Sequence, residues 1–584
     1  MLRHTDAAPN AVEFRSRLQQ HLEELADQVV LRILLAPSDA PVALTGSQVL
    51  QQSLALADRY LDAPDRGVVL LLLPHSVELF LLHLGVLLRG RIPAILAWPT
   101  SRVAPDKYQR NVLHQLRNLP ATQLLTLPRL AQNLDAALPY RVTSCPIAGV
   151  EKLEKTFAVD LVVEPVAKNT ALRAAGDTPA DALFLQFSGG TTGAQKCVVV
   201  TAGMLHAQLR VLAKCLDFGP RDVVVSWLPM YHDMGLIACL WLPLWSGASS
   251  VQFSAQDWLM DPALLFRLME RFAGTFTWLP NFAFAYMAGQ RARMKTPVSL
   301  RGVRAWINCS EPVRHRSIRG FVDAFTEWGV TAEKCQACYA MAENVFAVTQ
   351  TPLDRPPRTV PRSALSSSSQ GFGELAYDLV DDVYVSSGKT LEDVHLRIRA
   401  ADGSACPEKQ PGGIEIKTGS VFSGYWGNDG FQKQALSADG WYATGDYGFL
   451  DGDELFVIGR TKDIIIVGGQ NVFPEDVEMV VNTVEGVYPG RVVAFGTQDA
   501  QVGTENLAVV AEMRGEFQDE KAKKMEREIQ SLVLSAIGIA PRFARVVPER
   551  WIVKSTAGKI SRRETSLRFL AEMGKGPADA PKSS

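Results

Sequence analysis

The 584-residue sequence is poor in cysteine, with 8 scattered along the chain. This scarcity argues against a disulfide-rich secreted scaffold and is typical of a reducing cytoplasm. The closest pair, Cys335 and Cys338, has no second pair at zinc-site spacing and no thioredoxin-like surroundings. We therefore predict a cytoplasmic protein in which these two thiols belong to the core.

The sequence also lacks an excess of charge of either sign. Lysine and arginine number 60 and the acidic residues 62, which gives a formal net charge of −2. Proteins that bind nucleic acid or anionic membranes through their overall field need a marked positive charge. We therefore expect neither nucleic acid nor a membrane surface as a partner of the whole molecule.

Long uninterrupted apolar runs are absent. The first thirty residues carry charges throughout and contain no apolar signal core, so secretion is not expected. The most apolar segment, GVVLLLLPHSVELFLLHLGVLL, is interrupted by Pro74, His75 and Glu78. This pattern predicts a buried strand, a turn and a packed helix, and no membrane span.

What the sequence does contain is ample core material, since 47% of its residues are hydrophobic and 21% are charged. A chain of this length is expected to form two or more domains. Strand-like and helix-like segments alternate over about the first 350 residues, which predicts α/β layers. Residues 351–388 are rich in proline, serine and glycine, and we interpret them as a long loop or an insertion.

Strand-like segments resume after residue 388 and continue to Arg460. The remainder, with Pro474 near the start of a predicted helix, has the pattern of a small α+β unit. We therefore predict an N-terminal domain of residues 1–459 and a C-terminal domain of residues 460–584. The tail 574–584 is expected to be disordered.

The stretch FSGGTTGAQK, which ends at Lys196, separates two strand-like runs. Its glycines leave backbone N–H groups free to converge on an anion, and its threonines and lysine add further donors. The P-loop NTPase signature is absent, because Gln195 precedes the lysine and Cys197 follows it. We expect a strand–loop–strand unit that cradles a polyphosphate, followed by a helix capped by Thr201. Alone, the loop is also compatible with a hairpin that binds nothing.

Five polar residues in other motifs suit the same ligand. Asp446, in the turn of YATGDYGFL, could accept both hydroxyls of a ribose, and Glu343, after an apolar strand, is a suitable Mg²⁺ ligand. Arg460 and Lys462 stand at the predicted domain junction. Lys559, in the small-residue turn STAGK, could reach into the site of another domain, although a basic surface helix would also contain such a lysine.

In this order and spacing the motifs resemble the adenylate-forming superfamily of acyl-CoA synthetases, peptide-synthetase adenylation domains and luciferases, over nearly the whole chain. SWLPMYHDMGLI (226–237) and INCSEPVR (307–314) are similar to the fatty acyl-AMP ligase branch. The 45 positions between Glu343 and Gly388 resemble an insertion of that branch, which is thought to hamper the domain movement that admits CoA.

The resemblance implies an α/β fold with a large multi-subdomain N-terminal adenylating domain of mixed sheets and helices, and a small, mobile α+β C-terminal domain. It implies ATP and Mg²⁺ as cofactors, with Lys559, Glu343 and Arg460 as catalytic residues, Glu343 as the metal ligand and Lys462 as the hinge. The residues implied in nucleotide binding are Ser188, Gly189, Gly190, Thr191, Thr192, Gly193, Lys196, Ser310, Glu311, Pro312, Tyr339, Ala340, Met341, Asp446 and Arg460. Those expected at the acyl substrate are Trp227, Met230, His232, Asn308 and Cys309.

The implied reaction activates a fatty or related carboxylic acid to an acyl-adenylate, releases pyrophosphate and transfers the acyl group to an acyl carrier protein. The chain has no carrier serine of its own, so the accepting thiol must come from a partner or from CoA. Some acyl-AMP ligases lack the lysine that corresponds to Lys196. Its presence here leaves an acyl-CoA synthetase as an alternative interpretation. Gly189 and Gly190 replace the commoner Ser-Gly, and Ala340 replaces the commoner glycine, which makes an inactive adenylate-binding protein conceivable. His232 could line or close the acyl channel or be structural, and Trp227 and Met230 could equally be ordinary core.

Overall fold

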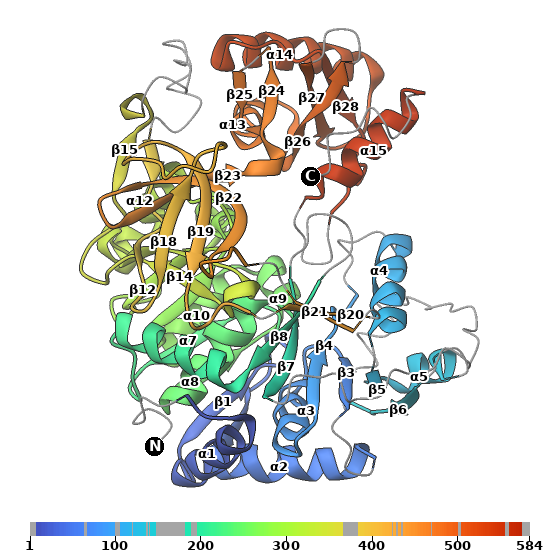
Figure 1. The fold of residues 1–584 in the computed structure, drawn as a ribbon, viewed down its shortest axis with the longest axis vertical. Helices are drawn as coiled ribbons and strands as arrows, with labels where there is room; N and C mark the ends of the chain where they lie inside the picture. Colours follow the sequence, from blue (N-terminus) through green and yellow to red (C-terminus); the bar gives the residue numbers. More distant parts are fainter. Residues whose placement is uncertain are drawn as a thin grey trace.

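The fold is known from a computed structural model of the chain (Figure 1). The described residues are 8–62, 67–99, 105–119, 121–135, 138, 140–147, 181–188, 196–365, 383–422, 424–427, 430–433, 436–468, 470–499, 504–554 and 560–574. The predicted tail beyond Gly574 therefore lies outside them.

The first large sheet has the strand order β21-β20-β8-β7-β4-β3-β5-β6. Its central strand β3 pairs in parallel with β4 and β5 and is buried along its whole length, which explains its unbroken apolar sequence. The predicted strand, turn and helix between Gly67 and Leu88 are confirmed, with Ser76 capping α3. The strands are β3 (Val68–Leu72), β4 (Ile92–Ile95), β5 (Ala121–Thr126), β6 (Arg141–Ser144), β7 (Ala182–Phe187), β8 (Cys197–Thr201), β20 (Gly424–Gly427) and β21 (Gly430–Lys433).

The second large sheet is mixed and has the order β18-β19-β22-β23-β17-β14-β13-β12-β11-β9-β10-β1-β2. Strands β9 to β13 pair in parallel, whereas β14, β17, β18, β19, β22 and β23 pair antiparallel. Its strands are β1 (Val29–Ile33), β2 (Val42–Thr45), β9 (Val223–Ser226), β10 (Ser249–Gln252), β11 (Phe276–Leu279), β12 (Ala305–Cys309), β13 (Cys335–Ala340), β14 (Ala347–Gln350), β17 (Lys389–Thr390), β18 (His395–Arg399), β19 (Gly412–Lys417), β22 (Tyr442–Asp451) and β23 (Glu454–Arg460). Cys335 and Cys338 are buried free thiols in β13, as predicted.

One late segment joins the two sheets. β19 and β22 belong to the second sheet, yet β20, which lies between them in the chain, pairs antiparallel with β8 of the first. Tyr425 of β20 stands opposite Val198 of β8. This pairing brings residues near 425 beside the start of β8, where Lys196 lies.

Helices pack against these sheets (Figure 1). Thr201 caps α7, as predicted, by accepting a hydrogen bond from the backbone N–H of Met204. The segment Met234–Trp241 forms a π-helix, η2, which continues into α8. Among the described residues, none of the helices is long and apolar enough to cross a membrane. The helices of this part are α1 (Ala11–Glu24), α2 (Gly46–Tyr60), α3 (Val77–Leu88), α4 (Pro105–Asn118), α5 (Pro128–Leu134), α7 (Ala202–Cys215), α8 (Leu242–Ser246), α9 (Ala255–Met260), α10 (Ala263–Arg271), α11 (Asn281–Gly289) and α12 (His315–Phe325), with short 3-10 helices η3 (Arg291–Arg293), η4 (Thr326–Trp328), η5 (Ala332–Lys334) and η6 (Ala342–Asn344).

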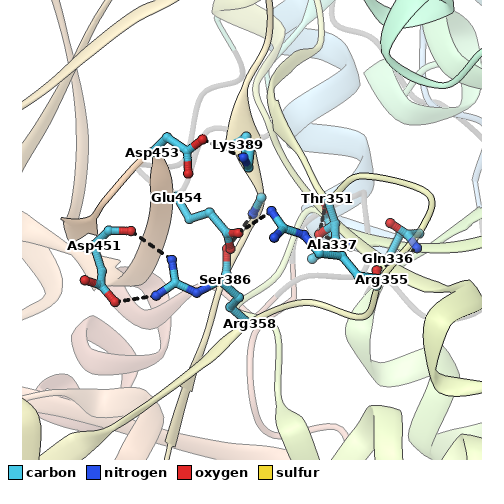
Figure 2. Close-up of polar contacts among 11 residues, drawn as sticks. Gln336, Ala337, Thr351, Arg355, Arg358, Ser386, Lys389, Asp451, Asp453 and Glu454 are labelled. Carbon is cyan, nitrogen blue, oxygen red and sulfur yellow. Dashed lines mark hydrogen bonds and ion pairs between the residues drawn. The ribbon is translucent and has the colours of Figure 1, made fainter.

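The described residues of the stretch 351–388 contain regular secondary structure. Its described residues form a two-stranded antiparallel sheet of β15 (Thr359–Pro361) and β16 (Val383–Val385), with η7 (Arg362–Ala364) after β15. Figure 2 shows how ion pairs hold its beginning to the turn between β22 and β23: Arg355 binds Glu454 at 2.9 Å and Arg358 binds Asp451 at 2.7 Å. Strands of three residues give too short a local pattern to be recognised from sequence. Residues 366–382 lie outside the described part.

The C-terminal part is a smaller α+β unit, drawn in orange and red in Figure 1. A three-stranded sheet in the order β26-β27-β28 packs against its helices, and two apolar clusters formed only by residues after Arg460 make its core. The predicted helix begins at Pro474, and β24 and β25 form an antiparallel hairpin before it. The elements are η9 (Thr461–Asp463), β24 (Ile465–Val467), β25 (Gln470–Val472), α13 (Pro474–Val481), β26 (Val487–Asp499), β27 (Thr504–Met513), α14 (Asp519–Ile537), β28 (Phe543–Val547) and α15 (Arg562–Glu572).

Candidate functional site

The glycine-rich stretch connects two paired strands. β7 and β8 are antiparallel, Phe187 stands opposite Cys197, and the backbone N–H of Ser188 donates to the carbonyl of Lys196 at 2.9 Å. The predicted strand–loop–strand arrangement is therefore confirmed at both ends of the loop. Its expected anion-binding residues Gly189, Gly190, Thr191, Thr192 and Gly193 lie outside the described residues.

Glu343 lies in η6, directly after β13. Its Oε1 accepts a hydrogen bond from the hydroxyl of Tyr425 at 3.0 Å, and its carbonyl accepts one from the backbone N–H of Phe422 at 2.7 Å. Burial raises the pKa of Glu343, while its own backbone N–H and the Tyr425 hydroxyl act in the opposite direction. Two residues later Val345 has a φ of 62°, which is strained for a β-branched residue. The chain around this carboxylate is therefore tightly held.

Lys196 contacts the ring of the same tyrosine, Tyr425. Its Nζ lies 4.6 Å from the centre of the Tyr425 ring, a cation–π contact. Sequence reasoning missed Tyr425, although the run GYWG, with two aromatic residues between glycines in an otherwise polar stretch, was a signal. One side chain thus contacts both the expected phosphate-binding lysine and the expected metal ligand.

Asp446 of β22 is shared by two partners. Its Oδ2 accepts a hydrogen bond from the Tyr339 hydroxyl at 2.5 Å, and its Oδ1 lies 3.4 Å from Nε of Arg460, its cross-strand partner on β23. Burial raises the pKa of Tyr339, and the Asp446 charge raises it further. Burial would lower the pKa of Arg460, but Asp446 and Asp463 outweigh that effect and raise it. The carboxylate is held in place and keeps lone pairs for further donors.

Positive charge is concentrated between the two parts of the chain. Burial lowers the pKa of Lys462, and the nearby cations Arg460 and Lys196 lower it further. Cations brought this close repel one another unless an anion lies between them. Lys196, Arg460 and Lys462 thus form a positive region that suits a polyphosphate.

The segment after β12 closes another side of the site. Ser310 has a φ of 71°, and its hydroxyl lies 3.8 Å from the Met234 sulfur. Glu311 accepts a hydrogen bond from the backbone N–H of Phe282 at 2.9 Å, and Pro312 continues the loop. Backbone strain in a short polar loop at the end of a strand is typical of binding sites.

Two further expected substrate residues lie at the end of β12. Asn308 is buried and donates to Asn281 Oδ1 at 3.0 Å. Cys309 is buried, with its sulfur 3.9 Å from the Ser310 hydroxyl. Both side chains therefore support the loop that follows them.

The expected acyl residues lie around the start of η2. His232 Nδ1 is 2.6 Å from Asp233 Oδ1, so the imidazole and the neighbouring carboxylate are in contact. Trp227 stacks on Trp258 with ring centres 4.1 Å apart, and Met230 is buried. Trp227, Trp258 and Met230 are members of the main core.

The remaining expected residues are Ala340 and Met341, at the end of β13, and Lys559, in the C-terminal part of the chain. Ala340 pairs with Ala347 beside an irregularity in β13, and the backbone N–H of Met341 donates to Phe346. Lys559 lies outside the described residues. Its described flank is fixed, because Lys554 and Ile560 form an antiparallel bridge.

Arg562 anchors the chain just after that bridge. Its guanidinium lies 3.2 Å from Asp463, 2.9 Å from Glu475 and 2.9 Å from Glu478. Three carboxylates around one buried guanidinium hold the start of α15 against η9 and α13. The chain that follows Lys559 is thus fixed within the C-terminal part at Ile560 and Arg562.

The described residues contain no group of three or more side chains able to hold a metal ion by themselves. Glu343 offers a single hard carboxylate oxygen next to the positive region. Mg²⁺ is commonly bound by one or two carboxylates together with substrate phosphates and water. The donor set therefore fits Mg²⁺ brought in with a nucleotide triphosphate.

Comparison with known proteins agrees with this geometry. A family described as AMP-binding enzyme matches residues 18–426, and the AMP-binding enzyme C-terminal domain matches residues 469–563. A putative acyl-CoA synthetase of Caulobacter vibrioides is 30% identical over 404 residues, 68% of this chain and 69% of that protein. The long-chain-fatty-acid–AMP ligase FadD32 of Mycobacterium marinum is 26% identical over 86% of this chain and 85% of its own.

Solved structures give the same fold. A structure from a study of fatty acyl-adenylate ligases of E. coli and L. pneumophila superimposes with a TM-score of 0.77 at 22% identity, covering 95% of this chain and 98% of that one. The expected fold, a large N-terminal adenylation domain with a smaller C-terminal domain, is confirmed. The chain belongs to the AMP-binding enzyme family of adenylate-forming ligases.

Proposed function

We propose that the protein uses ATP and Mg²⁺ to activate a fatty or related carboxylic acid as an acyl-adenylate and then transfers the acyl group to the phosphopantetheine thiol of an acyl carrier protein. The observation that carries this proposal is the connected set of side chains from both sheets, in which Tyr425 contacts Lys196 and Glu343 while Asp446 binds Tyr339 and Arg460. The relative named as a long-chain-fatty-acid–AMP ligase supports the choice of a fatty acid.

In the first half-reaction, an oxygen of the carboxylate forms a bond to the α-phosphorus of ATP. The bond from that phosphorus to the bridging oxygen of the β-phosphate breaks, and pyrophosphate leaves with the electron pair. No proton transfer is needed, so the protein contributes positioning and charge neutralisation. Lys196 binds the phosphates, Asp446 accepts the ribose hydroxyls, and Tyr339 with Ser310, Glu311 and Pro312 encloses the adenine.

Bound Mg²⁺, held by Glu343 and phosphate oxygens, would neutralise negative charge on the triphosphate. Lys559 would lie between the two reacting anions and reduce their repulsion. Arg562 fixes the chain just beyond Lys559, which makes a defined position for that amine possible. His232, Trp227 and Met230 would contact the acyl group.

In the second half-reaction, the thiol loses its proton to solvent and its sulfur forms a bond to the acyl carbon. The bond from that carbon to the phosphate oxygen breaks, and AMP leaves with the electron pair. A change in the orientation of the C-terminal part about Lys462, within η9, would open the anhydride to the thiol. The contacts of residues 355–362 with the rest of the molecule would oppose that change and disfavour free CoA.

An acyl-CoA synthetase is the second candidate. Lys196 is present and close to the site, and a relative is named as a putative acyl-CoA synthetase. An inactive adenylate-binding protein fits the site less well, because a decayed enzyme has no reason to keep Asp446 paired with Arg460 and Glu343 held by Tyr425.

One experiment separates these candidates. Pyrophosphate release is measured with a panel of carboxylic acids, and products are analysed with CoA alone and with a phosphopantetheinylated carrier protein alone. The proposal predicts acyl-AMP that persists with CoA and is consumed by the carrier protein. Rapid formation of acyl-CoA would establish the synthetase instead, and binding of ATP without pyrophosphate release from any acid would favour the inactive protein.

A further inference from the structure

Tyr425 has a position that the proposed reaction does not by itself explain. It belongs to β20, which pairs with β8, whereas Glu343 belongs to the connection between β13 and β14 of the other sheet. Its ring lies against the Lys196 ammonium and its hydroxyl donates to Glu343 Oε1. It is therefore a bridge between the two large sheets at the point where the expected phosphate and metal ligands meet.

The segment that carries Tyr425 holds Glu343 at two points. Phe422 donates its backbone N–H to the Glu343 carbonyl at 2.7 Å, and Tyr425 donates its hydroxyl to the carboxylate at 3.0 Å. The two rings pack together with centres 4.6 Å apart, and the Phe422 ring also contacts Tyr442. Backbone and side chain of Glu343 are thus fixed from the same direction, which restricts the carboxylate to one orientation.

The chemistry of the two contacts differs, and each suits its partner. A phenol donates one hydrogen bond to one carboxylate oxygen and leaves the second oxygen available to a cation. The face of an aromatic ring attracts an ammonium group but occupies none of its N–H donors, so Lys196 can still bind an anion. Tyr425 therefore contacts both side chains, while one carboxylate oxygen of Glu343 and the N–H donors of Lys196 stay available to bind a ligand.

We propose that Tyr425 is a positioning residue for a magnesium–triphosphate complex. Its hydroxyl orients Glu343 toward the metal, and its ring sets Lys196 beside the phosphates. The inference rests on the proposed function, because it takes Glu343 as the metal ligand and Lys196 as the phosphate ligand.

Two substitutions separate the two contacts. Tyr425→Phe keeps the ring beside Lys196 and removes the hydrogen bond to Glu343, whereas Tyr425→Leu removes both. Tyr140→Phe is the matched control, since the buried Tyr140 hydroxyl donates to the Leu116 carbonyl at 2.7 Å in another region of the first sheet. Thermal unfolding of each variant reports the general cost of losing one buried hydroxyl.

The measurement is equilibrium binding of α,β-methylene-ATP, which cannot release pyrophosphate, by calorimetry in EDTA and over a series of Mg²⁺ concentrations. For Tyr425→Phe we expect unchanged binding in EDTA and an approximately tenfold higher Mg²⁺ concentration at half-saturation, about 1.4 kcal/mol. Tyr425→Leu should in addition bind the nucleotide about tenfold more weakly in EDTA. Tyr140→Phe should match the wild type in both.

A double-mutant cycle tests whether Tyr425 acts through Glu343. In a Glu343→Gln background, Tyr425→Phe should leave the Mg²⁺ dependence unaltered. The inference is wrong if Tyr425→Phe has the wild-type Mg²⁺ dependence, or if its effect persists undiminished in Glu343→Gln. Failure of the wild type to bind the nucleotide at all would overturn the proposed function, and with it this inference.

Discussion

The Asp446 carboxylate divides its oxygens between Tyr339 and Arg460, two residues that lie 121 positions apart in the chain. Asp446 and Arg460 are cross-strand neighbours on β22 and β23, so their contact follows from one hairpin. Tyr339 arrives on β13, which is separated from β22 in the sheet by β14, β17 and β23. A carboxylate oriented in this way before any ligand arrives is suited to accept the two hydroxyls of a ribose.

The first prediction concerns this carboxylate. Asp446→Asn keeps the shape but removes the charge, and hydrogen bonds to a charged group contribute about 1.5–3 kcal/mol. We expect the KM for ATP in pyrophosphate release to rise about 10- to 100-fold. The control is Asp451→Asn at the far end of the same hairpin, which weakens its ion pairs with Arg358 (Figure 2) and Lys409, away from the candidate site. Equal KM values for Asp446→Asn and the wild type would exclude the ribose contact.

The second prediction concerns Lys559. Replacing it by alanine removes the proposed positive charge between the two reacting anions, and such electrostatic groups contribute factors of about 100 to 1,000 to rate. Lys559→Ala should form acyl-AMP at least about 100-fold more slowly and bind ATP with unchanged affinity. Lys523→Ala, on the exposed face of α14, serves as the control. Adenylation by Lys559→Ala at the wild-type rate would remove the catalytic role that we assign to it.

At the scale of single elements, the sequence predicted what local chemistry determines. Thr201 caps α7 through its hydroxyl, β7 and β8 flank the glycine-rich loop, and Pro474 opens α13, all as expected. The pairing of β20 with β8 could not be predicted, because the sequence of a four-residue strand does not show which strand, more than 200 positions away, it pairs with. The run GYWG marked Tyr425 as unusual, but the sequence did not show that Tyr425 would reach Lys196 and Glu343.

The candidate site shows the same division. Tyr339, Glu343, Asp446 and Arg460 were expected together because their motifs resemble those of a family. The region between β14 and β17 was expected as a long loop or an insertion. Within its described residues β15 and β16 pair with each other, a contact that strands of three residues do not reveal in the sequence. The segment Met234–Trp241 forms a π-helix, a local geometry that an apolar sequence pattern does not distinguish from a regular helix.

The third prediction concerns a buried histidine of α3. His83 packs edge-on against Phe184 and Trp241, and burial lowers the pKa of its imidazole from 6.5 to about 3. Below pH 6.5 the unfolded chain therefore binds a proton that the folded chain excludes. The free energy of unfolding should fall as the pH falls, by about 1.4 kcal/mol per pH unit from this group.

We would measure urea unfolding by tryptophan fluorescence at pH 6.5 and pH 4.5. His83→Phe keeps a ring and removes the titrating group, so its loss of stability over this interval should be smaller than that of the wild type by roughly 2–3 kcal/mol. The difference between the two proteins isolates His83 from other titrating residues. Equal losses in both would mean that His83 is charged or solvated in the folded state.

At the scale of the whole molecule, one buried ion pair connects the large and small parts. Arg362 of η7 makes two hydrogen bonds of 2.9 Å to Asp476 of α13, and its guanidinium lies over the Tyr384 ring. Arg314 approaches the same carboxylate at 3.6 Å. Although burial acts to raise the pKa of Asp476, the two arginines lower it overall. Arg362, which follows β15, thus binds the C-terminal part through an ion pair with Asp476.

The fourth prediction concerns this contact. Removing only one partner would leave a buried charge unpaired at a cost of about 3–5 kcal/mol, so both are replaced, in Arg362→Met with Asp476→Leu. We expect acyl-CoA formation from CoA to rise severalfold, because the C-terminal part reorients more readily, while acyl-AMP formation is preserved. Deletion of residues 354–370 should act in the same direction.

The matched control is Arg304→Met with Asp222→Leu, which removes an ion pair of 2.8 Å confined to the large part. This control variant should form acyl-CoA from CoA at the wild-type rate. If the Arg362 and Asp476 double variant folds and also forms acyl-CoA at the wild-type rate, this contact does not restrict access of CoA.

The measurement that tests the central claim most directly is exchange of labelled pyrophosphate into ATP by the wild-type protein, with fatty acids of increasing length and Mg²⁺, and with mass detection of the acyl-adenylate. We predict exchange that requires both the acid and the metal, together with a mass equal to acyl-AMP. Binding of ATP without exchange for any of the acids would contradict the assignment of this site to fatty acid adenylation.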